Sequence, residues 1–295
     1  DKKNALTPAM YAALADALNG ANGVVWHAMP FPSSGFSDVF VSAVYLAPDS
    51  PFAPQLSEFN AYLETVCGML RRGRPFSQLA VYLPFEDALM QSGVGGAEPT
   101  HGLPSDWAKR LPGVPVETEG YHPLWINESL LHDATWADDE IQAGGVSVSA
   151  LYIDVEWMDA ATLEQVVRLA RAGAPVVLKR PPALPGMRRH AQYAGWLAEL
   201  AALPNVVDGI ERLSVRPLVS GDDLPFYWAR QGAGELLIFF AHPQAKEVGF
   251  PLIYGQSFSD AAVERTVTLS YGGSSREVTL QFEPNQSLMA RLTRS

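Results

Sequence analysis

Apolar residues recur at helical spacing in the segment "FAPQLSEFNAYLETVCGMLRRGRP". The positions that share one face are Leu56, Phe59, Leu63, Val66 and Leu70. This i, i+3, i+4 spacing is typical of an amphipathic helix. Arg71 and Arg72 suit the C-terminal end of the helix dipole, and Gly73 suits the position just beyond it. The pattern therefore predicts a helix from Leu56 to Arg72.

Short apolar runs alternate with helical patterns over the first two thirds of the chain. The expected strands are "GVVWH", "QLAVYLPFED" as far as Pro84, Ser147 to Val155, and "PVVLK". The other expected helices follow a Thr7 cap, follow an Asp159 cap, and span Arg188 to Ala202. Alternation of this kind predicts an α/β fold with parallel strands.

The pattern of apolar and polar residues changes near Val206. Strand-like runs then follow one another between glycine-containing turns, and "SYGGSSREV" is typical of a hairpin. We expect an antiparallel β-domain here, arranged as a sandwich. Residues 88–120 are rich in Gly and Pro, which predicts a long surface excursion with a short helix near Trp107 to Leu111.

Composition excludes some classes of partner. The 295 residues are 47% hydrophobic and 18% charged, as in ordinary globular proteins, and carry a net charge of −11. Such an acidic chain repels phosphate backbones, so we expect no nucleic-acid partner. No apolar stretch is long enough to predict a membrane span, and this chain shows no signal peptide. The one cysteine, Cys67, is expected to be a buried thiol.

Candidate chemistry lies where the predicted parallel strands end, because ligands bind beyond the carboxyl ends of such strands. The polar residues at these ends are His27, Glu86, Asp87, Asp154, Glu156 and Asp159. His27 either lines a ligand site or hydrogen-bonds to the backbone. The acids have structural alternatives, because Asp159 suits a helix N-cap and Glu86 and Asp87 suit a helix start. Asp154 and Glu156 share one face of their strand.

Other motifs of chemistry are absent from the sequence. It contains no HxH, HExxH, GxGxxG after a strand, phosphate-binding lysine loop or GxSxG elbow, so we expect no metal site and no cofactor. Paired carboxylates, in contrast, are what glycoside hydrolysis requires.

Five segments, in order, resemble a known family. They are "GVVWHAMPFP", "LSEFNAYLETVCGMLRRGRPFSQLAVYLPFED", "GYHPLWINESLL", "VSALYIDVEWMDAATLEQVVRLARAGAPVVL" and "NQSLMARL". Together they resemble the C-terminal half of large bacterial glycoside hydrolases of family 106, the α-L-rhamnosidases. The resemblance implies three parts. Residues 1–75 would be the last strand and helix of a (β/α)8 barrel, residues 76–213 an amidotransferase-like (flavodoxin-like) α/β domain, and residues 214–295 a β-sandwich.

The resemblance also implies where the chemistry is. His27 would line the sugar site at the end of the eighth barrel strand, and the two catalytic carboxylates would precede this chain. The amidotransferase-like domain would be non-catalytic, because Cys67 lies in the preceding helix and not on a nucleophile elbow. This chain alone would be inactive. Its partners would be a carbohydrate substrate and the upstream barrel polypeptide, and a homo-oligomer would be possible. Its location would be periplasmic or extracellular.

Two alternatives remain open from the sequence. The chain could be a self-contained, non-enzymatic carbohydrate-binding or oligomerisation module, in which Glu86, Asp154 and Glu156 matter more than His27. It could also be an enzyme that uses Glu86 with Glu156, which requires carboxyl groups about 5 to 10 Å apart.

Overall fold

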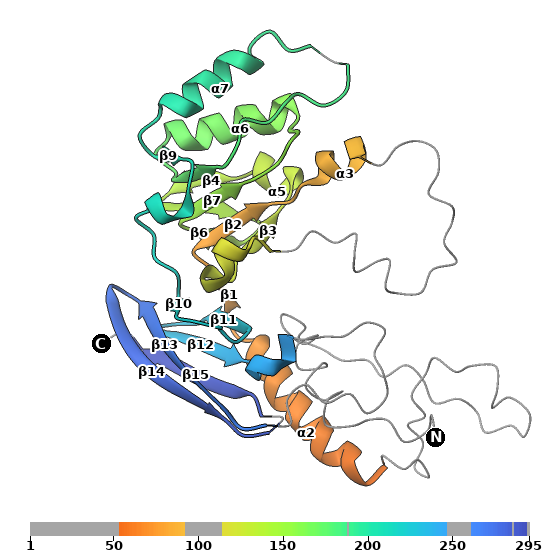
Figure 1. Ribbon diagram of the computed structural model, residues 1–295, viewed down its shortest axis with the longest axis vertical. Helices are drawn as coiled ribbons and strands as arrows, with labels where there is room; N and C mark the ends of the chain where they lie inside the picture. The colour runs from red at the N-terminus through yellow and green to blue at the C-terminus, as the bar shows by residue number, and fades with distance from the viewer. Residues whose placement is uncertain (1–52, 92–113, 188, 247–260, 285, 294–295) are drawn as a thin grey trace, which may run out of the picture. The chain divides into compact units, whose positions relative to one another are not determined.

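The computed structural model describes residues 53–91, 114–187, 189–246, 261–284 and 286–293 (Figure 1). The first predicted helix, the "GVVWH" strand with His27, and the predicted helix near Trp107 lie outside the described residues. The chain clusters into two compact units. One comprises residues 75–224 and 267–278, and the other comprises residues 1–74, 225–266 and 279–295.

Five parallel strands form the centre of the first unit. They are β2 (Leu79–Tyr82), β3 (Leu124–Ile126), β7 (Ala150–Ile153), β8 (Val176–Leu178) and β9 (Val206–Val207). Their order is β3-β2-β7-β8-β9, and every neighbouring pair is parallel. The chain thus leaves β2 toward β3 on one side and later returns to β7 on the other side. The carboxyl ends of β2 and β7 mark the point where the winding reverses.

Helices cover one face of this sheet. They are α5 (Glu128–His132), α6 (Ala160–Arg171) and α7 (Tyr193–Ala202), and α6 and α7 lie side by side (Figure 1). The steps from β7 to β8 and from β8 to β9 run in the same direction, so right-handed crossovers place both helices on the same face. Leu151, Ile153 and Val176 of the strands and Leu163 and Val166 of α6 are buried together there.

The opposite face has a thinner cover. The 3-10 helices η1 (Val116–Tyr121) and η2 (Ile210–Arg212) lie over buried Leu79, Val81 and Tyr152. The step from β2 to β3 runs against the direction of the later steps, so a right-handed crossover brings η1 to this face.

A three-stranded antiparallel meander precedes β7 and was not predicted from the sequence. Its strands are β4 (Thr135–Ala137), β5 (Glu140–Ala143) and β6 (Val146–Val148). The single strand predicted from Ser147 to Val155 is therefore wrong, because β6 and β7 belong to different sheets. The break falls at Ser149, whose N–H donates to the carbonyl of Gln78 at 2.9 Å.

Other expected elements of this unit are confirmed. Helix α6 follows the Asp159 cap, β8 coincides with the "PVVLK" run, and Gly173 ends α6 with φ +112°. The helix predicted from Arg188 begins later, at Tyr193.

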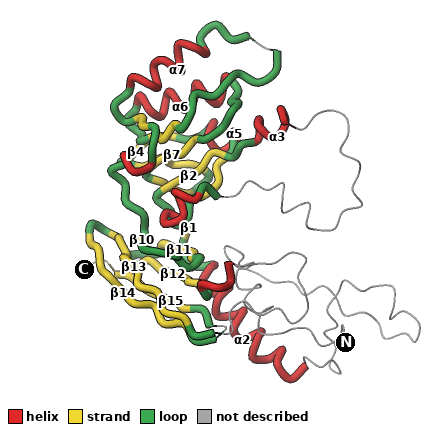
Figure 2. The backbone as a smooth tube through the Cα atoms, viewed as in Figure 1, coloured by secondary structure: helices red, strands yellow, loops and turns green. Residues whose placement is uncertain are grey.

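The second unit is built from α2 (Ala53–Leu70) and an antiparallel sheet. The sheet order is β1-β11-β12-β15, from β1 (Arg74–Pro75), β11 (Tyr227–Gln231), β12 (Glu235–Phe240) and β15 (Leu288–Thr293) (Figure 2). The predicted amphipathic helix is confirmed, because Val66, Met69 and Leu70 of α2 pack with Leu237 and Phe239 of β12. The buried thiol expected at Cys67 is also found on α2.

A further sheet has the order β10-β13-β14, from β10 (Val219–Ser220), β13 (Val263–Tyr271) and β14 (Ser274–Phe282). The expected hairpin at "SYGGSSREV" joins β13 to β14, with positive φ at Gly272 and Gly273. The protein is thus mixed α/β, with a five-stranded parallel sheet and antiparallel sheets. Among the described residues, no helix has the length and apolar character needed to cross a membrane.

Candidate functional site

The acidic residues predicted as site candidates lie beyond the carboxyl ends of β2 and β7. The chain turns after β2 at Pro84 and enters α3 (Phe85–Gln91), with Glu86 and Asp87 in its first turn. The helix start foreseen for these two acids is therefore present. After β7 the chain continues through Asp154 and Glu156 to the start of α6 at Asp159.

Asp87 ties these two strand ends together. Its carboxylate accepts hydrogen bonds from the backbone N–H of Glu156 at 2.9 Å and of Trp157 at 2.8 Å. Two backbone donors are thereby satisfied by one side chain. Asp87 is an anchor for the turn after β7 and not a group free to act on a ligand.

Asp159 is the N-cap of α6, as one reading of the sequence proposed. Its Oδ1 accepts from the backbone N–H of Ala161 at 2.7 Å and of Thr162 at 3.1 Å, and its Oδ2 accepts from the Thr162 hydroxyl. Its carboxylate satisfies donors that a helix start otherwise leaves unpaired.

Asp154 and Glu156 have different surroundings. Asp154 forms an ion pair with Arg180, with Oδ1 2.7 Å from Nε. Glu156 is exposed, and its backbone carbonyl accepts from the Ala183 N–H at 2.8 Å. The shared strand face expected for these two acids does not exist, because β7 ends at Ile153.

Glu86 is the buried carboxyl of the group, with 6% of its surface exposed. The hydroxyl of Tyr82 donates to it, 2.8 Å from Oε1 and 3.0 Å from Oε2, and the Asp159 N–H lies 3.5 Å from Oε1. Burial raises the pKa of Glu86 above its ordinary value, against the lowering effect of these donors. Burial, and next the charge of Glu86, raises the pKa of the Tyr82 phenol.

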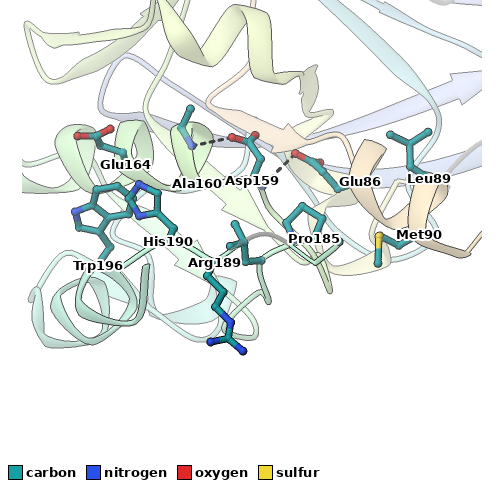
Figure 3. Close-up of a pocket in the computed structure, with 13 residues that line it drawn as sticks. Glu86, Leu89, Met90, Asp159, Ala160, Glu164, Pro185, Arg189, His190 and Trp196 are labelled. Atoms are coloured by element: carbon teal, nitrogen blue, oxygen red, sulfur yellow. Dashed lines mark hydrogen bonds between the residues drawn. The ribbon is translucent and has the colours of Figure 1, made fainter. Parts of the chain in front are cut away.

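A groove of about 610 Å³ opens beside Glu86 (Figure 3). Its lining comes from α3, the start of α6, the loop after β8, and α7: Glu86, Leu89, Met90, Asp159, Ala160, Ala161, Glu164, Leu184, Pro185, Gly186, Arg189, His190 and Trp196. The rings of His190 and Trp196 stack, with centroids 4.8 Å apart. Of the four predicted site residues, Glu86 lines the groove, Asp154 and Glu156 do not, and His27 lies outside the described residues.

Sequence reasoning missed several members of this site. Tyr82 lies four residues before Glu86, so the pair could have been suspected from that spacing. Arg180 follows β8. It could be recognised as the partner of Asp154, at the end of β7, only if β8 were already known to lie beside β7. The stacking of His190 on Trp196 could not be foreseen, because no residue pattern in the sequence indicates that these two rings meet.

Two-carboxylate hydrolysis needs one acid that gives a proton and one carboxylate that is free to accept or attack. Glu86 has the raised pKa of an acid, but the other groove carboxylate beside it, Asp159, is occupied by the α6 cap. Across the described residues, no group of three or more His, Cys, Asp or Glu side chains could hold a metal ion.

No protein-family model matches this chain, and no curated protein matches it either.

Proposed function

We propose that this chain is the C-terminal part of a glycoside hydrolase that resembles the family 106 α-L-rhamnosidases and acts on plant or microbial polysaccharide. The catalytic acid and base precede this chain. Here the α/β unit is a non-catalytic, amidotransferase-like domain, and the antiparallel strands belong to a β-sandwich. The order of the five resembling sequence segments is the basis of the proposal.

The sheet topology supports the domain assignment. Numbered along the chain, the five parallel strands have the order 2-1-3-4-5, which is the flavodoxin-like order of doubly wound sheets. Burial on both faces of β12 supports a sandwich, because Leu236, Ile238 and Phe240 are buried as well as the residues that face α2.

The observation that carries the non-catalytic assignment is the occupation of the strand-end acids. Asp87 binds two backbone amides, Asp159 caps α6, and Asp154 is paired with Arg180. Each of these three carboxylates has a structural partner, so none of the three is free to act as a second carboxylate beside Glu86.

Hydrolysis of 4-nitrophenyl α-L-rhamnoside tests the proposal. The purified 295-residue chain should release nitrophenol no faster than buffer, whereas the full product of the native gene should release it rapidly. Loss of a slow rate from the chain on Glu86→Gln substitution would instead identify Glu86 as a catalytic acid. That result would contradict the proposal and favour the enzyme that uses this unit's own acids.

A self-contained carbohydrate-binding module is the second candidate, favoured by the groove itself. An open groove with carboxylates and an aromatic pair at strand carboxyl ends is a common place for a ligand. Saturable binding of methyl α-L-rhamnoside by the chain, lost on Glu86→Gln substitution, would support this candidate.

A further inference from the structure

The groove beside Glu86 has the position and size of a small-molecule site. It lies at the carboxyl ends of β2 and β7, where the winding of the sheet reverses. Its volume of about 610 Å³ is within the range usual for ligand pockets, which is roughly 300 to 1,000 Å³. The inference developed from this groove does not depend on the glycoside hydrolase proposal.

Glu86 is a buried carboxyl whose partners are neutral. Its donors are the Tyr82 hydroxyl and the Asp159 N–H. In the described part of the chain, neither Glu86 nor Glu164 forms an ion pair with a lysine or arginine. Buried charges in proteins are normally paired, so a carboxylate in this position is suited to an incoming cation.

The remaining lining has the same sign of charge. Asp159 and Glu164 add two carboxylates, and Arg189 is the one strong base among the described residues of the lining. The guanidinium of Arg189 extends away from Glu86 and Asp159 (Figure 3). A cation in the groove therefore meets an excess of negative charge close to it, and an anion does not.

The walls of the groove determine the kind of cation. Leu89 and Met90, which are 58% and 42% exposed, form one wall, and Leu184 and Pro185 contribute another apolar surface. The stacked rings of His190 and Trp196 add aromatic surface. Apolar walls suit an organic body, whereas a metal ion needs several oxygen or nitrogen ligands, and no such group is formed by the described residues.

We propose that this groove binds a small organic cation, an amine or guanidine with an apolar body, whose charged head pairs with Glu86. The apolar body lies against Leu89, Met90 and Pro185. In the free protein, burial raises the pKa of Glu86. A bound cation favours the ionised form of this carboxyl and therefore lowers its pKa again. Affinity therefore falls as the pH is lowered through the Glu86 pKa, and binding near that pH releases a proton.

Ligand-observed NMR and calorimetry with 2-phenylethylamine test the proposal, with 2-phenylethanol as the neutral analogue of the same shape. The amine should bind about tenfold more tightly than the alcohol, which corresponds to about 1.4 kcal/mol. Glu86→Gln should remove this preference. Glu164→Gln, a change at an exposed side chain that leaves folding intact, should weaken amine binding less than Glu86→Gln does, because it removes one negative charge from the groove lining. Glu277→Gln, at an exposed β14 carboxylate outside the groove, is the matched control and should change nothing.

Three results would overturn the proposal. One is equal binding of the amine and the alcohol. Another is amine binding that Glu164→Gln and Glu86→Gln both leave unchanged. The third is displacement of the amine by methyl α-L-rhamnoside at comparable affinity, which would assign the groove to a neutral sugar. None of them bears on the hydrolysis test, so the two proposals fail separately.

Discussion

Backbone amides near the carboxyl ends of β2 and β7 need acceptors, and acidic side chains supply them. Asp87 serves the turn after β7, and Asp159 serves the first turn of α6. Glu86 differs from both, because its hydrogen bonds come chiefly from the Tyr82 hydroxyl and it faces a groove. Asp87 and Asp159 thus satisfy backbone donors, whereas Glu86 is held by a side-chain hydroxyl at the edge of the groove.

Replacing the α6 cap separates the capping role from charge. Asp159→Ala removes the acceptor for two backbone N–H groups, and it should lower the free energy of unfolding by about 1 kcal/mol. Asp159→Asn keeps the acceptor oxygen, so its free energy of unfolding should fall much less. Chemical denaturation of both variants measures this, and equal losses would show that capping is not what Asp159 contributes.

The pH dependence of stability should reveal the buried Glu86. Burial raises its pKa, so the folded protein binds this proton more tightly than the unfolded chain does. The stability from this group is complete below the ordinary pKa of glutamate and is lost as the pH rises through the raised value. Glu86→Gln cannot titrate, so the wild-type protein should lose stability relative to the variant as the pH rises above the ordinary pKa of glutamate. A difference that is constant with pH would contradict the raised pKa.

Some residue roles follow from the sequence and others do not. The Asp159 cap could be predicted because a cap and its helix are neighbours in the chain. The pairing of Asp154 with Arg180 could not, because it joins the ends of two strands that come together only in the folded sheet.

Turn residues set the boundaries of the strands in the β4-β5-β6 meander. Asp138 and Asp139 between β4 and β5, and Gly144 and Gly145 between β5 and β6, all have positive φ. Two-residue turns of this type join tight hairpins. The signal was present in "ADDE" and "AGGV", but the apolar run after them was interpreted as one strand, which hid the boundary at Ser149. The strongly periodic α2 and α6, in contrast, were predictable.

Gly73 should be the less tolerant of two glycines with similar backbone angles. Its φ is +56°, and an added methyl group would meet the Gln231 carbonyl, whereas Gly145, at φ +79°, faces open space. Gly145→Ala should lower the free energy of unfolding by about 1 kcal/mol, because alanine is strained in the left-handed backbone conformation. Gly73→Ala should cost clearly more, because the Arg230 guanidinium also holds the carbonyls of Arg72 and Gly73 at 2.9 and 2.7 Å. Thermal unfolding of the pair checks this, and equal losses would show that the contact with Gln231 is unimportant.

Alternation of strands and helices predicts a parallel sheet at the scale of the whole molecule, and the structure confirms it. The strand order could not be predicted, because it depends on which side of β2 each later strand joins. That order is what places Glu86 and Asp159 at one edge and opens the groove between α3 and α6. The position of the site is thus a property of the topology, although two of its acids, Glu86 and Asp159, could be singled out from the sequence.

The intact mass of the native gene product, measured under denaturing conditions, tests whether the catalytic acid and base of a glycoside hydrolase precede this chain. We expect a mass far above 32.0 kDa, with the additional polypeptide joined before Asp1. A native product of 32.0 kDa would contradict it, and the groove at the ends of β2 and β7 would then become the place to seek the protein's own activity.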